Sequence, residues 1–125
     1  MRSWITRVVV AGCAALGLSL AVVSAHHSSA GIDREKTVTL NGTVKEFRWA
    51  NPHSWIDLDV PASAGVAAAT WSIEMTSPAF LLRSGWKSST LKTGDKVSVT
   101  VRPMRDGTPG GLFVSVTLAD GKVLK

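Results

Sequence analysis

The sequence predicts a mainly β protein, a small barrel of five strands with one short helix between the third and fourth strands. Five segments carry apolar residues at alternate positions, as half-buried strands do. The segment between the third and fourth of these strands instead has residues typical of the beginning and the end of a helix. The chain has 125 residues, 45% of them hydrophobic and 18% charged, which is too apolar for a disordered chain and leaves room for one small domain.

The first predicted strand, residues 37–49, is long and coiled. Its apolar residues alternate, but the phase changes halfway along, so we expect a bulge or sharp bend near Lys45 and Glu46. Asn51-Pro52 ends the strand, because proline has no N–H donor and restricts the residue before it. The apolar residues are Val38, Leu40 and Val44 before the change of phase and Phe47 and Trp49 after it.

Two further strands and a helix follow. Residues 55–60 alternate between an apolar face and a face with Trp55, Asp57 and Asp59, and residues 71–75 alternate in the same way. Ser77-Pro78 then resembles an N-cap followed by a first-turn proline, and Gly85 resembles a C-cap. We expect the apolar residues of this short helix to plug one end of the barrel; they are Phe80, Leu81 and Leu82.

The last two predicted strands, residues 97–101 and 112–118, are joined by a hairpin with its tip at 106–111. Asp120-Gly121 makes a final turn before a short tail. This order of elements is that of an OB-fold, a partly open Greek-key barrel. Small β-barrels without a helix at that position are the alternative.

The first 25 residues have the pattern of a signal peptide. Arginines precede an apolar run at residues 8–23, and Val23-Ser24-Ala25 is a small-residue cleavage site. We expect cleavage after Ala25, a periplasmic or secreted protein, a flexible leader at 26–36 and the barrel domain at 37–125. A retained anchor and a lipoprotein modified at Cys13 are the alternatives, although the run is shorter than the roughly 20 residues that span a bilayer.

Cleavage would change the charge and the thiol content. The full chain has 14 basic and 9 acidic residues and a net charge of +5, and loss of the two N-terminal arginines leaves +3. No run of Lys or Arg remains, so we expect no nucleic-acid partner, and no membrane span remains after cleavage. The single cysteine is lost as well, which suits an exported protein and excludes a Cys-based zinc site.

The three histidines suggest a metal site. His26 and His27 would begin the mature chain, and His53 lies in the loop between the first two strands, a rim where OB-folds bind ligands. Neutral imidazole is a good ligand for copper, zinc or nickel. The free amine and ring of His26 could chelate one ion, as in the histidine brace of copper oxygenases. We therefore expect a non-enzymatic binding or accessory protein, with copper as the first candidate ion.

Tryptophans flank the same loop. We expect Trp49 and Trp55 to line a ligand site or to stack on the ligand, and Asn51 to orient the loop. Trp55 shares the phase of the polar face, which makes it the best candidate for a partner surface. A metal-free adaptor that docks on another exported protein is thus the alternative function. A small hydrolase built on His53, Ser54 and Asp57 is a third.

Several motifs together resemble a known family. They are Ala25-His26-His27-Ser28, Gly42-Thr43-Val44, Trp49-Ala50-Asn51-Pro52-His53-Ser54-Trp55, Gly94-Asp95-Lys96-Val97 and Asp106-Gly107-Thr108-Pro109-Gly110-Gly111. On these residues the chain resembles domain-of-unknown-function family 6152, uncharacterised small exported bacterial proteins. The resemblance spans the whole predicted mature chain. It implies an exported, single-domain bacterial protein and assigns no activity.

Overall fold

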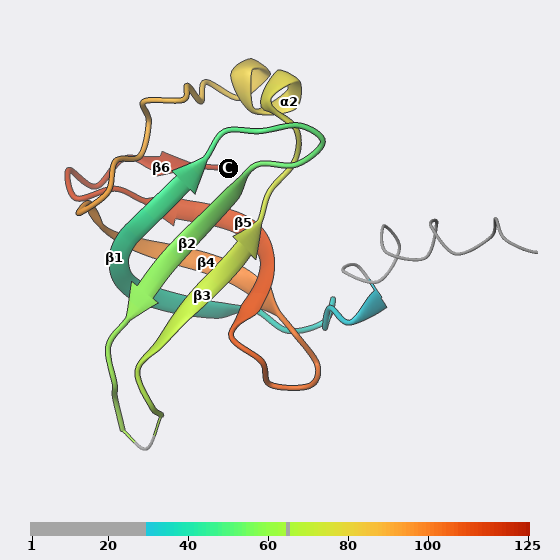
Figure 1. The fold of residues 1–125 in the computed structure, drawn as a ribbon, viewed down its shortest axis with the longest axis vertical. Helices are drawn as coiled ribbons and strands as arrows, with labels where there is room; N and C mark the ends of the chain where they lie inside the picture. Colours follow the sequence, from blue (N-terminus) through green and yellow to red (C-terminus); the bar gives the residue numbers. More distant parts are fainter. Residues whose placement is uncertain (1–29, 65) are drawn as a thin grey trace, which may run out of the picture.

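A computed structural model describes residues 30–64 and 66–125 of the chain, as a barrel of β-strands with one short helix at its upper end (Figure 1). The predicted signal peptide and the histidines at 26 and 27 lie outside the described residues. The elements are β1 (Val38–Arg48), β2 (Trp55–Val60), β3 (Ala69–Glu74), α2 (Pro78–Arg83), β4 (Lys96–Pro103), β5 (Gly110–Thr117) and β6 (Val123–Leu124).

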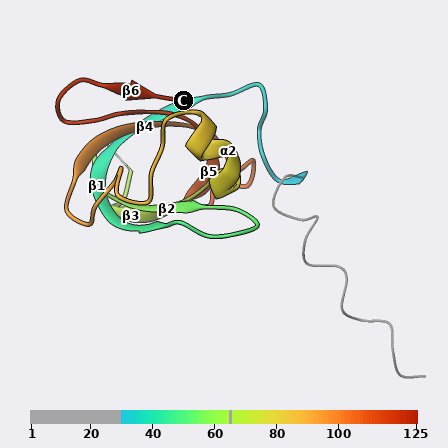
Figure 2. The same cartoon turned by 90° about the horizontal axis from the view of Figure 1, so that it is seen from above.

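The strands are arranged in the order β3-β2-β1-β4-β5-β6, and each of these neighbouring pairs is antiparallel. The sheet closes because β3 also pairs with β5 in parallel. Figure 2 shows the strands surrounding the interior, with α2 lying over one side of the ring. This topology, with a helix between β3 and β4, confirms the predicted OB-like barrel.

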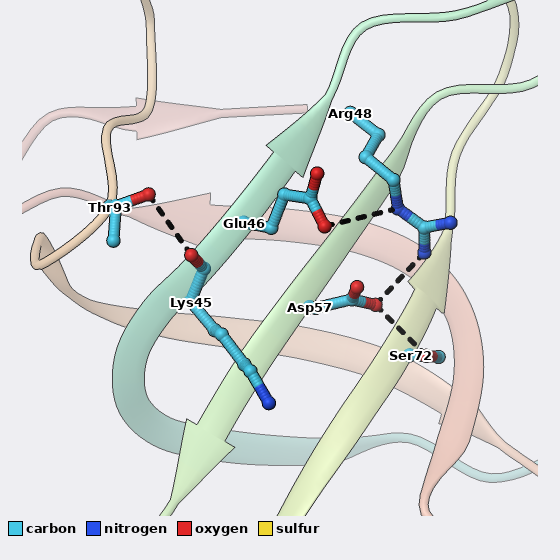
Figure 3. Close-up of polar contacts among 6 residues, drawn as sticks. All are labelled: Lys45, Glu46, Arg48, Asp57, Ser72 and Thr93. Carbon is cyan, nitrogen blue, oxygen red and sulfur yellow. Dashed lines mark hydrogen bonds and ion pairs between the residues drawn. The ribbon is translucent and has the colours of Figure 1, made fainter.

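The long first strand pairs with β4 through its first half and with β2 through its second half. The predicted bulge lies where expected, because Lys45 has no partner on β2 between the paired residues Val44 and Glu46. The carbonyl oxygen of Lys45 instead accepts a hydrogen bond of 3.0 Å from the Thr93 hydroxyl, which comes from the loop before β4 (Figure 3). The bulge is therefore held in place from outside the sheet.

The core lies inside the barrel and is filled by the inward-facing residues of every long strand. Ile56, Leu58 and Ile73 are fully buried there. Trp71 is partly buried against this core, as its phase in β3 predicts. Trp86, which follows α2 in the chain, is fully buried in the same core, and its ring packs edge-on against Phe113 at 5.4 Å between ring centroids.

The helix plugs the barrel less completely than the sequence suggests. Leu81 is buried, but Phe80 and Leu82 are 59% and 58% exposed, so the prediction that all three fill the end of the barrel is wrong. Consecutive residues of a helix point about 100° apart, and a helix of six residues has one buried stripe. Gly85 follows the helix with a φ of 85°, and the next residue, Trp86, is fully buried in the core.

Both ends of the described chain are attached to the barrel. Residues 123–124, expected to be a tail, form strand β6 and pair with β5. Within the expected flexible leader, Ile32 is 3% exposed and forms a bridge with Met104. The amide of Arg105 also donates to the carbonyl of Gly31 at 2.8 Å. Residues 31–33 therefore belong to the folded domain.

Candidate functional site

The Asn-Pro-His loop and the outer face of β1, β2 and β3 form the candidate site. Ile56 and Leu58 of β2 point into the core, so Trp55, Asp57 and Asp59 face outward, as the alternation predicts. Their neighbours across the sheet are polar or charged as well. In register, Trp55 lies between Arg48 and Glu74, and Asp57 lies between Glu46 and Ser72.

His53 is anchored by a buried carboxylate. Its Nδ1 atom is hydrogen-bonded to Oε1 of Glu74, the last residue of β3. The side chain of Glu74 is 9% exposed, whereas that of His53 is 50% exposed. When Nδ1 carries the proton and donates it to the carboxylate, Nε2 is the basic nitrogen of the ring and is free to accept a proton or bind a metal ion.

The backbone explains why these two residues meet. The loop has a cis peptide bond between Asn51 and Pro52. After it, the amide of Ser54 donates to the carbonyl of Thr76 at 3.0 Å, and the amide of Met75 donates to the carbonyl of Ser54 at 2.9 Å. The pairing of β2 and β3 thus continues past both strands and brings the residues before Ser54 and Met75 to one side of the sheet.

A second group of polar contacts joins side chains on the outer face of β1, β2 and β3 (Figure 3). The guanidinium of Arg48 donates to Asp57 at 3.0 Å, and the hydroxyl of Ser72 donates to the same carboxylate oxygen at 2.9 Å. Arg48 also lies 4.0 Å from the carboxylate of Glu46 and 5.6 Å from the centre of the Trp55 ring. Trp55 is therefore partly buried under a cation that is itself held by two carboxylates.

The predicted site residues are only partly brought together. Asn51 and His53 are exposed in the loop, and Trp55 stands on the neighbouring outer face. Trp49 is partly buried and packs edge-on against Phe47, with 5.9 Å between ring centroids, so it belongs more to the edge of the core than to an open rim. His26 and His27 lie outside the described residues.

Two members of the site were not predicted from the sequence. Glu74 lies in the polar phase of the predicted strand 71–75, but the sequence does not indicate that it contacts His53, and it does not single out Arg48. The outward phase of both residues is visible in the alternation of their strands. Their neighbours depend on the register between strands, which the alternation alone does not fix.

The hydrolase arrangement is not formed. Ser54 is fully buried, and its hydroxyl has no hydrogen-bond partner in the part of the chain that the structure describes. Asp57 is bound to Arg48 and Ser72 rather than to His53. Among residues 30–64 and 66–125, no group of three or more His, Cys, Asp or Glu side chains is placed to hold a metal ion.

Fold and site together define a small OB-like barrel with a carboxylate-anchored histidine in its first loop. The model of a family described as "Family of unknown function (DUF6152)" matches residues 15–114, and the chain belongs to this family. Comparisons with curated proteins and with solved structures gave no match. No helix within the described residues has the length and hydropathy needed to cross a membrane.

Proposed function

We propose that this chain is a non-enzymatic, exported binding protein that binds a transition-metal ion through His53, with copper as the preferred ion. The observation that carries the proposal is the hydrogen bond between His53 and the buried Glu74. Metal-binding histidines commonly donate their second nitrogen to a carboxylate, which fixes the tautomer and makes the ligating nitrogen more basic. The half-exposed ring of His53 has this arrangement.

The remaining ligands of this proposal come from the N-terminus. A new terminus at His26 would offer its amine and ring, with His27 beside it, and nitrogen ligands of this kind favour Cu(II). In Figure 1 the described chain begins beside the connection between β4 and β5, at the end of the barrel away from the Asn-Pro-His loop. His27 lies three residues before Ala30, a reach of at most about 11 Å of backbone. The contributions of the terminus and of His53 therefore need separate tests.

Metal titration of the exported protein, with its N-terminus checked by intact mass, tests the proposal. Cu(II), Cu(I) and Zn(II) are titrated into the wild type, His53→Ala and the double variant His26→Ala/His27→Ala. We expect one copper ion per chain with a Kd below about 1 µM, or about −8 kcal/mol, and a loss of at least tenfold in affinity in His53→Ala. Asp59→Asn is the matched control, because this exposed carboxylate bonds to Thr70 and not to His53.

The outcome separates the two ligand groups. Unchanged affinity in His53→Ala would rule out the role of His53 in metal binding. Unchanged affinity in the double variant, with loss in His53→Ala, would restrict the site to the loop. Wild-type protein with no metal bound tighter than micromolar would contradict the metal proposal as a whole.

The second candidate function is a metal-free adaptor. It is favoured by Trp55, a large aromatic side chain that stands on the outer face of β2 rather than in the core. Co-purification from the envelope fraction of the source bacterium is the test, with wild-type protein and Trp55→Ala as baits. A defined partner retained by the wild type and lost by the variant would support the adaptor. Identical protein sets on both baits would contradict it.

A further inference from the structure

The upper end of the barrel presents two large apolar side chains to solvent. Phe80 and Leu82 of α2 are 59% and 58% exposed. The helix that carries them is fixed, because Leu81 between them is 3% exposed and the amide of Trp86 donates to its carbonyl at 3.0 Å. The fold therefore keeps both side chains outside the core, where the contact of their apolar surface with water is unfavourable.

The segment that contains α2 is basic, and the neighbouring carboxylate of Glu74 is 9% exposed and bonded to His53. From Met75 to Gly94 the sequence has three basic residues and no Asp or Glu. The guanidinium of Arg83 lies 5.4 Å from the centre of the Phe80 ring. Lys87 follows directly after the buried Trp86 and is exposed. Figures 1 and 2 show the loop of residues 49–54, which has no acidic residue either, beside α2.

The exposed apolar side chains and the positive charge together limit the kind of partner that could bind the α2 end of the barrel. A second copy of the chain would bring like charges together, which disfavours a symmetric contact through α2. The occupant must therefore be anionic and must accept two separate apolar side chains. A membrane of anionic phospholipids meets both conditions, because its phosphates attract Lys and Arg and its interface admits Phe and Leu side chains. A protein partner would require a wider contact of about 800 Å² on each side.

We propose that the end of the barrel formed by α2 and residues 49–54 binds the surface of anionic phospholipid membranes. Phe80 and Leu82 enter the interface, and Arg83 and Lys87 contact the lipid phosphates. The contact is peripheral and reversible, since a helix of six residues offers few apolar side chains. This inference is independent of metal binding, and either proposal can fail without the other.

Vesicle flotation of the exported protein tests the inference, with vesicles of phosphatidylcholine alone and with one-third phosphatidylglycerol. We expect binding to the anionic vesicles only, weakened by 0.5 M NaCl. The variant Phe80→Ser/Leu82→Ser should bind at least tenfold more weakly, and Arg83→Gln/Lys87→Gln should lose several-fold in affinity. All of these side chains are exposed, so the variants should keep the wild-type unfolding temperature.

Matched controls come from other parts of the surface. Val66→Ser removes a side chain that is 65% exposed in the connection between β2 and β3, and Arg34→Gln/Lys36→Gln removes two charges of the N-terminal segment. We expect both controls to bind vesicles like the wild type. Loss of binding in the Phe80→Ser/Leu82→Ser variant, which leaves the N-terminal residues unchanged, separates this surface from any effect of the N-terminal apolar run. Wild-type protein that does not float with anionic vesicles would overturn the inference. Equal binding by the Phe80/Leu82 variant, or binding to soluble polyglutamate in place of vesicles, would overturn it as well.

Discussion

Replacement of Gly42 by alanine is a direct test of how the barrel is built. Gly42 lies in β1 opposite Val97 of β4, close to the backbone of β2. A Cβ atom at this position would lie 2.5 Å from the carbonyl oxygen of Asp59 and 2.9 Å from Cγ of Leu58. The nearest atom belongs to the backbone of a paired strand, and Leu58 is fully buried, so neither neighbour can move without disturbing the barrel.

The magnitude follows from two opposing effects. Extra atoms in a packed interior cost about 1–3 kcal/mol, and a clash with backbone falls at the upper end of this range. Alanine also restricts the unfolded chain, which offsets roughly 0.4–1 kcal/mol. We expect Gly42→Ala to lower the free energy of unfolding by about 2–2.6 kcal/mol, or the unfolding temperature by roughly 8–20 °C for a domain of this size.

Urea and thermal unfolding followed by circular dichroism measure this change, and Gly107→Ala is the control. Gly107 has a φ of 79° with open space around its Cβ position. Alanine there is strained in conformation but meets no neighbour, so we expect a loss of only about 1 kcal/mol. A Gly42→Ala variant as stable as Gly107→Ala, or more stable, would refute the claim that close packing of β1 on β2 requires glycine.

The remaining predictions concern a buried hydroxyl, the bulge and a hairpin carboxylate. Ser54→Ala should raise the free energy of unfolding by about 1 kcal/mol in urea titrations, because the buried hydroxyl has no partner in the described chain; a loss of stability would contradict this. Thr93→Val should lower the free energy of unfolding by about 1 kcal/mol, because the carbonyl of Lys45 loses its 3.0 Å hydrogen bond. An unchanged urea midpoint would contradict the claim that Thr93 stabilises the bulge. Hydrogen bonds from the hydroxyl and the amide of Thr108 hold the pKa of Asp106 below its ordinary value of 3.8. The ionised carboxylate therefore stabilises the folded state at pH values above 3.8. This contribution to stability is lost as the pH falls through the lower pKa of the folded state. Thr108→Ala should raise the pKa of Asp106 in an NMR titration, and no change would contradict the assignment.

The sequence alone determined the type and order of the main elements. Alternation of apolar residues is a local property, so it identified the five long strands, the outward face of β2 and the change of phase at the bulge in β1. Proline and glycine marked the helix between β3 and β4, because each restricts or frees the backbone at its own position. The position of His53 in the loop between β1 and β2 followed from this order.

Tertiary structure decided which residues meet. Glu74 bonds to His53, and Arg48 lies over Trp55, only because the register places residues of different strands side by side. The parallel closure of β3 on β5 and the short strand β6 are likewise long-range pairings. The exposure of Phe80 and Leu82 was also decided at this level, because the core buries Leu81 and Trp86 of this segment and leaves those two side chains outside. A pattern along one strand specifies a face, whereas a site requires neighbours from several strands, and these are fixed only when the barrel closes.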